Sequence, residues 1–395
     1  MPKEMISVSP AEPRTVLVAG TYSATDAYPN TKYRLSLLQK QAYLTVTERN
    51  FPSSNKLSYD SQAGRIISLL FAALKLTAAT LAASFSVLRF RNKDVLYVPY
   101  PSPLLLFTLS LLPKSARPKS IIADVFISLY DTAVVDRRLF SASGIFAKIL
   151  LYMERRAYLV AHCLVTDTPE NSEYYSKLFD IPAESFTAIP LSINEAVFKP
   201  SPDKKKGNRF KVLFAGTMVP LQGIRTICEA IAKVDSSLPI DFLFVGDGQD
   251  SAILENFFLN APERFELQYQ WERKWQDSDS LAALIQSADL CLGIFGDQAK
   301  TNRVWPLKNY LYMACGKTLI TSDTKVAKRL QENTQGHPFA MVSPANPSQL
   351  ARTIQTLYAD PAQIHSIGEC ARAFFTEHLS SRASNEKFLK LFDQR

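Results

Sequence analysis

Acidic and basic side chains follow a predicted buried strand in the first half of this 395-residue chain. The strand is the apolar run Ser120 to Ile127, and the segment Ile127 to Arg138 reads ISLYDTAVVDRR. Carboxylates at the end of a buried strand can orient a hydroxyl group or accept its proton. The candidates for such chemistry are Asp124, Asp131, Asp136, Arg137 and Arg138. Helix caps and surface ion pairs are the alternative explanation of the same residues.

Three cations lie close together in the second half of the sequence. The segment Gly293 to Gly316 reads GIFGDQAKTNRVWPLKNYLYMACG and contains Lys300, Arg303 and Lys308. A guanidinium can hold phosphate oxygens through two parallel hydrogen bonds, whereas a lysine acts as a point charge. The spacing therefore predicts binding of a diphosphate. A basic loop in solvent is the alternative.

Two glycine-containing turns precede these cations, and each follows a predicted strand. Gly216 to Gly223 reads GTMVPLQG and leads into a helix, where free backbone N–H groups and the helix dipole attract an anion. Gly246-Asp247-Gly248 lets the backbone approach a ligand such as a nucleotide base or a diphosphate. Tight turns without a ligand remain the alternative for both.

Other chemistries are disfavoured by the sequence. None of its four histidines stands at a strand end predicted to face the cleft, and its five cysteines are scattered without metal-ligand spacing, as expected of buried thiols in a reducing compartment. No Ser–His–Asp arrangement, P-loop or zinc motif is present, so no metal site is expected. A nicotinamide-dependent oxidoreductase is disfavoured because the G-x-G-x-x-G turn with a later acidic residue is absent.

The elements that must position these residues are short apolar strands that alternate with helices. Because the strands are apolar throughout rather than at every second residue, they indicate parallel sheets covered by helices on both faces. The predicted strands are Thr15–Gly20, Asp94–Pro99, Ser120–Ile127, Cys163–Asp167, Phe210–Gly216, Asp241–Gly246, Asp289–Phe295 and Thr318–Ser322.

The pattern breaks once, at a polar stretch rich in proline and lysine, and then restarts. It predicts an α/β protein of two Rossmann-like domains, with ligands beyond the carboxyl ends of the strands in a cleft between them. The expected bounds are 1–195 for the first domain, 196–208 for a linker, 209–374 for the second domain, and 375–395 for a C-terminal helix that could cross back to the first.

The formal net charge of +8 and the pI of about 9.1 favour anionic partners. Nucleic acid is disfavoured, because no arginine-rich block or aromatic–basic interleaving is present. An anionic membrane surface and phosphate ligands are the favoured partners, with chance surface charge as the alternative.

The segment Ile66 to Phe90 is long and apolar enough to span a bilayer, but it carries Lys75 and several hydroxyl side chains. We expect a helix packed in the first domain, with a face available to the membrane, rather than a span. The residues from Met1 to Arg14 lack the apolar core of a signal peptide, so we predict a cytoplasmic protein, peripheral on the inner membrane face.

In their order and spacing, these pieces resemble the family 4 retaining glycosyltransferases over nearly the whole chain. The second half carries the best matches: Phe210 to Ala230 (FKVLFAGTMVPLQGIRTICEA), Phe244 to Gly248 (FVGDG) and Met313 to Lys317 (MACGK). In the first half, Asp167-Thr168-Pro169 and the run from Ile189 to Pro200 are similar to the family's approach to its linker. The resemblance implies the GT-B fold.

The chain departs from the family pattern at four positions. Thr217 and Gln222 stand where the family has an arginine and a lysine that hold the donor diphosphate. Arg303 and Leu311 stand where it has two glutamates that contact sugar and ribose, and a leucine cannot accept a hydrogen bond from ribose. Other cations could have taken over the phosphates, or the chain could have lost donor binding.

The resemblance implies a metal-independent transfer of a hexose, with retention, from a nucleotide sugar to a glycan or lipid-linked acceptor in cell-surface polysaccharide synthesis. The donor is then a substrate, and no cofactor is expected. The expected catalytic residues are Asp131 and Arg303. The expected donor site is Gly216, Thr217, Gln222, Gly246, Asp247, Lys300, Arg303 and Lys308, and the expected acceptor site is Gly20, Tyr22, Asp124, Asp131 and Arg137. The alternative is a non-catalytic GT-B homologue that serves as partner or scaffold of a polysaccharide-synthesis complex.

Overall fold

The structure is a computed structural model that describes residues 13–25, 29–52, 62–137, 139–201, 209–260, 267–332, 334 and 336–393, with only the backbone of 62–70. It divides into two compact units. The first unit contains Met1–Val125, Arg155–Leu164 and Leu391–Arg395, and the second contains Phe126–Glu154 and Val165–Lys390. Residues 202–208 of the predicted linker, and Arg138, lie outside the described residues. The predicted domain boundaries stay predictions.

One six-stranded sheet has the order β2-β1-β3-β4-β5-β6. The neighbours β1–β2, β1–β3 and β3–β4 pair in parallel. Its strands are β1 (Arg14–Gly20), β2 (Leu44–Asn50), β3 (Val95–Val98), β4 (Ile121–Asp124), β5 (Cys163–Thr166) and β6 (Phe186–Ala188). The helices between them are α1 (Pro29–Gln39), α2 (Gln62–Arg89), α3 (Pro103–Ser110), α4 (Ile145–Tyr158) and α5 (Pro169–Phe179).

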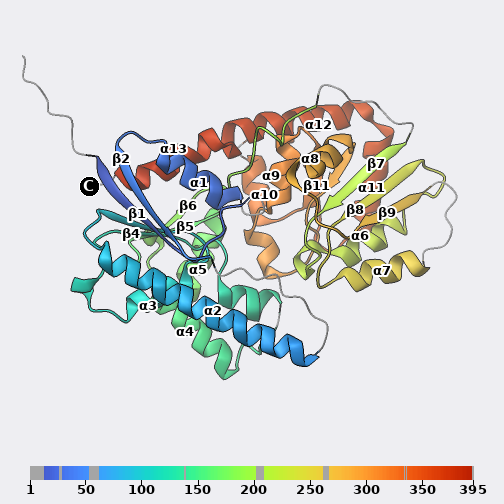
Figure 1. Cartoon of the computed structure of the whole chain (residues 1–395). Helices are drawn as coiled ribbons and strands as arrows, with labels where there is room; N and C mark the ends of the chain where they lie inside the picture. The colour runs from blue at the N-terminus through green and yellow to red at the C-terminus, as the bar shows by residue number, and fades with distance from the viewer. Residues whose placement is uncertain are drawn as a thin grey trace, which may run out of the picture. The chain divides into compact units, whose positions relative to one another are not determined.

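The other six-stranded sheet has the order β12-β11-β10-β7-β8-β9, and every neighbouring pair is parallel. Its strands are β7 (Phe210–Ala215), β8 (Ile240–Val245), β9 (Gln268–Glu272), β10 (Leu290–Leu292), β11 (Thr318–Ser322) and β12 (Ala340–Val342). Its helices are α6 (Ile224–Ile231), α7 (Ser251–Asn260), α8 (Ser278–Ser287), α9 (Leu307–Ala314), α10 (Lys325–Glu332), α11 (Pro347–Ala359), α12 (Pro361–Phe374) and α13 (Ser381–Asp393) (Figure 1).

Helices cover both faces of the second sheet. Within β7, Leu213 and Ala215 face a core shared with α8, α9, α10 and α12, whereas Val212 and Phe214 face a core shared with α6, α7 and α11. Because successive side chains of a strand point to opposite faces, a strand covered on both sides must be apolar throughout. This burial explains the continuous apolar runs in the sequence. The predicted fold class, α/β with two Rossmann-like sheets, is confirmed.

Candidate functional site

The second unit brings together two of the sequence-predicted acids and two of the predicted cations. Asp131 begins the π-helical turn η2 (Asp131–Asp136), and Arg303 ends the 3-10 turn η5 (Ala299–Arg303). Arg303 Nη2 donates to Asp131 Oδ1. Lys300 Nζ lies 3.3 Å from Asp131 Oδ2 and 3.0 Å from Asp136 Oδ2. The four side chains form a mostly buried network in which each charge faces an opposite one.

Protein groups also hold the rest of Arg303. Its Nη1 donates to Asn171 Oδ1 at 2.8 Å, and its guanidinium carbon lies 3.8 Å from the centre of the Tyr174 ring. Its carbonyl oxygen accepts a hydrogen bond of 2.6 Å from the Thr168 hydroxyl. The guanidinium would have to release Asn171 and Asp131 before it could bind a phosphate through both of its Nη atoms. The contact between Arg303 and a diphosphate therefore stays a prediction.

The loop that carries Asp131 is anchored by Glu154, a buried residue of α4 that is not among the site residues predicted from the sequence. Glu154 accepts hydrogen bonds from the Ser128 hydroxyl at 2.7 Å and from the backbone N–H groups of Leu129 and Tyr130, both at 2.8 Å. The Ser128 hydroxyl in turn accepts from the Asp131 N–H at 3.0 Å. The available signal was that Glu154 is the single acid among the apolar and basic residues 137–162.

Lys308 is the predicted cation with the least compensated charge. It is the second residue of α9, it is buried, and among the described residues its Nζ has no hydrogen-bond partner. The ammonium lies 3.7 Å from the centre of the Phe214 ring. A Cβ placed on Gly216 would lie 3.9 Å from Lys308 Nζ, so the cation reaches the turn that follows β7. Burial lowers the pKa of Lys308 well below its usual value.

Two further polar side chains of the second unit are buried without a described partner. Neither the amide nitrogen nor the amide oxygen of Asn309, the residue after Lys308, has one, and Gln222 Oε1 has none. Buried polar groups in folded proteins almost always have a partner. Lys308, Asn309 and Gln222 follow β10 and β7, which are neighbours in a parallel sheet, so all three belong to elements at the carboxyl end of the strands.

The glycines of the predicted donor turns allow loops to pack backbone against backbone. A Cβ on Gly246 would lie 2.3 Å from the Gly216 carbonyl oxygen, and one on Gly248 would lie 2.5 Å from the Met218 carbonyl oxygen. The same turns exchange two hydrogen bonds, from Met218 N to Asp247 O at 3.1 Å and from Asp250 N to Met218 O at 2.8 Å. These contacts require glycine whether or not a ligand binds, and they fix the loops beside Lys308.

The outer part of these turns is accessible. Thr217 is exposed and Asp247 is half-buried. The Ser251 hydroxyl donates to Asp247 Oδ1, and this hydrogen bond lowers the pKa of the Asp247 carboxyl. Asp247 is therefore an ionised acceptor at the rim of the turns, and it can receive hydrogen bonds from a polyhydroxyl ligand.

The predicted acceptor residues are divided between the two units. In the first unit, Asp124 is fully buried, with Arg34 bonded to one carboxylate oxygen and the Tyr97 hydroxyl 2.7 Å from the other. Burial raises the pKa of the Asp124 carboxyl, although Arg34 opposes the shift. Because both carboxylate oxygens are bonded within the first unit, Asp124 stabilises the ends of the strands.

The remaining acceptor residues are placed as follows. Gly20 ends β1, and the buried Tyr22 donates to Glu48 Oε1 at 2.7 Å, also in the first unit. Arg137, in the second unit, is exposed. One acceptor site built from both units stays a prediction.

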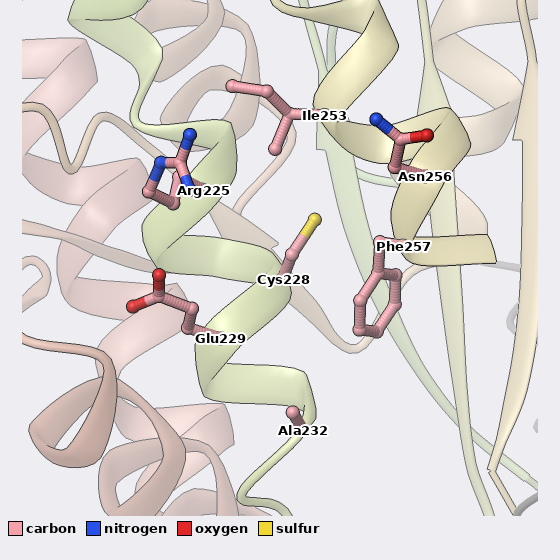
Figure 2. A pocket seen from close by; sticks show the side chains of 7 residues that line it. All are labelled: Arg225, Cys228, Glu229, Ala232, Ile253, Asn256 and Phe257. Atoms are coloured by element: carbon pink, nitrogen blue, oxygen red, sulfur yellow. The ribbon is translucent and has the colours of Figure 1, made fainter. Parts of the chain in front are cut away.

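Two cavities in the second unit contain none of the predicted site residues. One, of about 320 Å³, lies between α6 and α7 and is lined by Cys228 of α6 and by Ile253 and Phe257 of α7, among others (Figure 2). Burial raises the pKa of the Cys228 thiol to about 12, so it is no nucleophile at neutral pH. The other, of about 200 Å³, is lined by Asp167, Trp305 and Arg329 among others. Among the residues that the structure describes, no group of His, Cys, Asp or Glu is arranged to hold a metal.

The second half of the chain is similar to a known protein family: residues 209–360 match the family model described as Glycosyl transferases group 1. Among curated proteins, none matches the chain by sequence.

Solved structures match the fold over nearly the whole chain. HepE from Anabaena in complex with UDP is 12% identical, with 96% of this chain and 99% of that chain covered and a TM-score of 0.65. Sucrose-phosphate synthase from Thermosynechococcus elongatus is 16% identical, with 97% and 99% covered and a TM-score of 0.66. A glycosyltransferase from Rickettsia africae is 12% identical, with 96% and 98% covered and a TM-score of 0.65. The chain therefore has the GT-B fold, and its residues 209–360 are similar to the glycosyl transferases group 1 family.

Proposed function

We propose that this protein is a retaining hexosyltransferase that uses a uridine diphosphate sugar as donor. Its acceptor is a glycan or lipid-linked hydroxyl in cell-surface polysaccharide synthesis, and it works in the cytoplasm at the inner membrane face. HepE, whose fold this chain shares, has been crystallised with UDP and with UDP-glucose. The match of residues 209–360 to a transferase family supports the same class of reaction.

The observation that carries the proposal is the buried amino group of Lys308, which has no described hydrogen-bond partner. Burial disfavours its charged form, and an anionic ligand beside it would favour that form. Lys308 Nζ lies beside the Gly216 turn, which follows β7, and open parallel sheets bind their ligands beyond the carboxyl ends of the strands. With a donor diphosphate bound there, Lys308 would take the place of the family cations that are missing at Thr217 and Gln222.

The proposed reaction needs positioning and charge stabilisation more than a protein base. The bond between the anomeric carbon and the diphosphate oxygen breaks, and its electron pair stays on that oxygen. The acceptor hydroxyl attacks from the same face and passes its proton to the departing diphosphate oxygen. Lys308 stabilises the charge that develops on the leaving group, and the network of Asp131, Arg303 and Lys300 holds the loops around it.

The test is UDP binding by calorimetry to the wild type, to Lys308→Met and to Lys233→Met, which removes an exposed lysine of the same unit. We expect Lys308→Met to weaken binding at least about tenfold, because a hydrogen bond to a charged group contributes about 1.5–3 kcal/mol. Without ligand, the same variant should melt at a higher temperature, since an unpartnered buried polar group costs about 1–3 kcal/mol. Equal UDP affinity in all three proteins would refute the role of Lys308.

A non-catalytic GT-B homologue is the second candidate, and Leu311 favours it. Leu311 is buried in the core between β7 and α9, so no carboxylate takes the place of the family's second glutamate. Transfer or hydrolysis of UDP-glucose by the purified protein would decide for the enzyme. UDP binding without turnover, together with co-purification of an active transferase, would decide for the partner.

A further inference from the structure

Helix α2 of the first unit leaves a row of large apolar side chains in solvent. Phe71, Leu74, Leu81 and Phe85 are 58%, 65%, 59% and 70% exposed. Their spacing of three, seven and four residues puts them on one side of the helix, since an α-helix repeats every 3.6 residues. Contiguous apolar patches of this kind are rare on monomeric soluble proteins, and they mark interaction surfaces.

The opposite side of α2 is packed against the first unit, as expected from the sequence. Ala83 and Val87 are fully buried, and the Ser84 hydroxyl lies 2.6 Å from the Thr108 hydroxyl of α3. Figure 1 draws α2 as one long helix. The stretch Phe71–Arg89 has a mean hydropathy of 1.6 and is long enough to cross a bilayer, but 22% of its most apolar window is buried in the protein. A helix that keeps these contacts lies along a membrane surface rather than through it.

The charges around this face are mostly positive, and the one acid between the two stretches described next, the exposed Asp94, is bonded to Thr15. From Gln62 to Lys93 the sequence contains five basic residues and no acidic one. From Val95 to Ala123 it contains Lys114, Arg117 and Lys119, and again no acid. Lys75, Arg89 and Arg91 are exposed. A row of Phe and Leu bordered mainly by positive charge is complementary to anionic lipid headgroups above an apolar layer.

The second unit repeats this pattern on α4 and the segment before it. The exposed large apolar side chains there are Leu139, Phe140, Ile145, Phe146, Ile149 and Tyr152. The one acid of this segment, Glu154, is buried and is used by the loop that carries Asp131. The solvent-facing charges therefore come from basic residues such as Arg137 and Lys148. The same combination occurs in both units, so it is not an accident of one helix.

We propose that the exposed apolar face of α2, with its basic border, binds the surface of an anionic lipid bilayer. Apolar side chains enter the boundary between headgroups and acyl chains, and the basic residues contact the headgroups. This binding does not depend on the transferase activity proposed above, and a protein without turnover would show it equally.

The test is flotation of the full-length protein with vesicles of phosphatidylcholine, alone or mixed with phosphatidylglycerol. We expect binding to the mixed vesicles and at least about tenfold weaker binding to the neutral ones. The double variant Leu81→Ser/Phe85→Ser should lose at least about tenfold in affinity for mixed vesicles. Leu259→Ser, which changes a 77% exposed leucine of α7, is the matched control and should bind like the wild type.

A second variant separates charge from apolar contact. Arg89→Gln/Arg91→Gln should weaken binding to mixed vesicles and reduce its dependence on salt, because exposed charges are screened. Unchanged melting temperatures show that each variant is folded. Wild-type protein that stays with neither vesicle would overturn the proposal. So would self-association in the absence of lipid that Leu81→Ser/Phe85→Ser abolishes, because the face would then be a protein interface.

Discussion

At the scale of single residues, the three predicted cations have different surroundings. Arg303 and Lys300 face carboxylates, whereas Lys308 faces an aromatic ring and has no described hydrogen-bond partner. The sequence shows all three as equivalent basic residues in one segment. Their difference arises from residues far away in the chain, such as Asp131 and Phe214, so it could not be predicted from local spacing.

Arg303→Ala should destabilise the protein strongly. The substitution leaves Asp131 buried with Lys300 as its remaining partner, and breaking a buried ion pair typically costs about 3–5 kcal/mol. Urea unfolding measures the loss. In an Asp131→Asn background the same substitution should cost much less, because no charge is then left uncompensated. Equal costs in both backgrounds would contradict the coupling between Arg303 and Asp131. The proposed transferase activity should fall at least about tenfold in the single variant, because the loops that Arg303 holds would no longer be positioned.

Asp167 should make stability depend on pH. Burial raises the pKa of its carboxyl from 3.8 to about 6. The folded state therefore holds a proton that the unfolded state has released, so the stabilisation is complete below about pH 4 and is lost as pH rises to about 6. Relative to Asp167→Asn, the wild type should lose about 3 kcal/mol over this window, at 1.36 kcal/mol per pKa unit. Asp279→Asn, at an exposed position, is the control, and its free energy of unfolding should depend on pH as that of the wild type does.

At the scale of elements, the sequence predicted the interior strands and missed the edges. The eight predicted strands correspond to β1, β3, β4, β5, β7, β8, β10 and β11, which all lie inside the sheets. The four missed strands, β2, β6, β9 and β12, are the edges. An edge strand is covered less completely, so it need not be apolar throughout, and β9 reads QYQWE. A continuous apolar run in the sequence therefore indicates a strand that is buried on both faces, and it does not reveal a strand that is only partly buried.

The loop before η2 offers a prediction at this scale. In Glu154→Ala, the Ser128 hydroxyl and two N–H groups lose their acceptor, and the protein should be destabilised by at least about 3 kcal/mol. Hydrogen exchange at Leu129 and Tyr130 should become faster, because their amides are no longer bonded. Glu154→Gln keeps an acceptor oxygen and should have a smaller effect on both measurements. Unchanged exchange in Glu154→Ala would show that the loop is held by other contacts.

At the scale of the whole molecule, the chain returns to its first unit at its last turn. Phe392 of α13 is buried, and its ring meets that of Tyr97 edge-on at 5.9 Å. Arg14, at the start of β1, donates to the Phe392 carbonyl oxygen. The rest of α13, up to Lys390, belongs to the second unit. One helix thus contributes to the stability of both units.

Phe392→Ala should destabilise the first unit, since removal of a buried phenylalanine typically costs about 3–5 kcal/mol. Lys390→Ala, at a position two residues earlier that is largely exposed, is the matched control and should change stability little. Urea unfolding of each variant, with hydrogen exchange of the β3 amides as the readout for the first unit, measures the effect of both substitutions. Loss of stability in the second unit alone would contradict this role of Phe392.

The packing of Phe392 against Tyr97 and Arg14 also has a consequence for synthesis on the ribosome. Tyr97 and Arg14 leave the exit tunnel long before Phe392 is made, so the first unit cannot complete its core while the rest of the chain is translated. Until Phe392 is made, the first unit exposes the apolar surface on which Phe392 will pack, and chaperones and neighbouring nascent chains can bind there. Translation speed and chaperone supply should therefore affect the yield of this protein more than they would if each unit were closed by its own continuous stretch of chain.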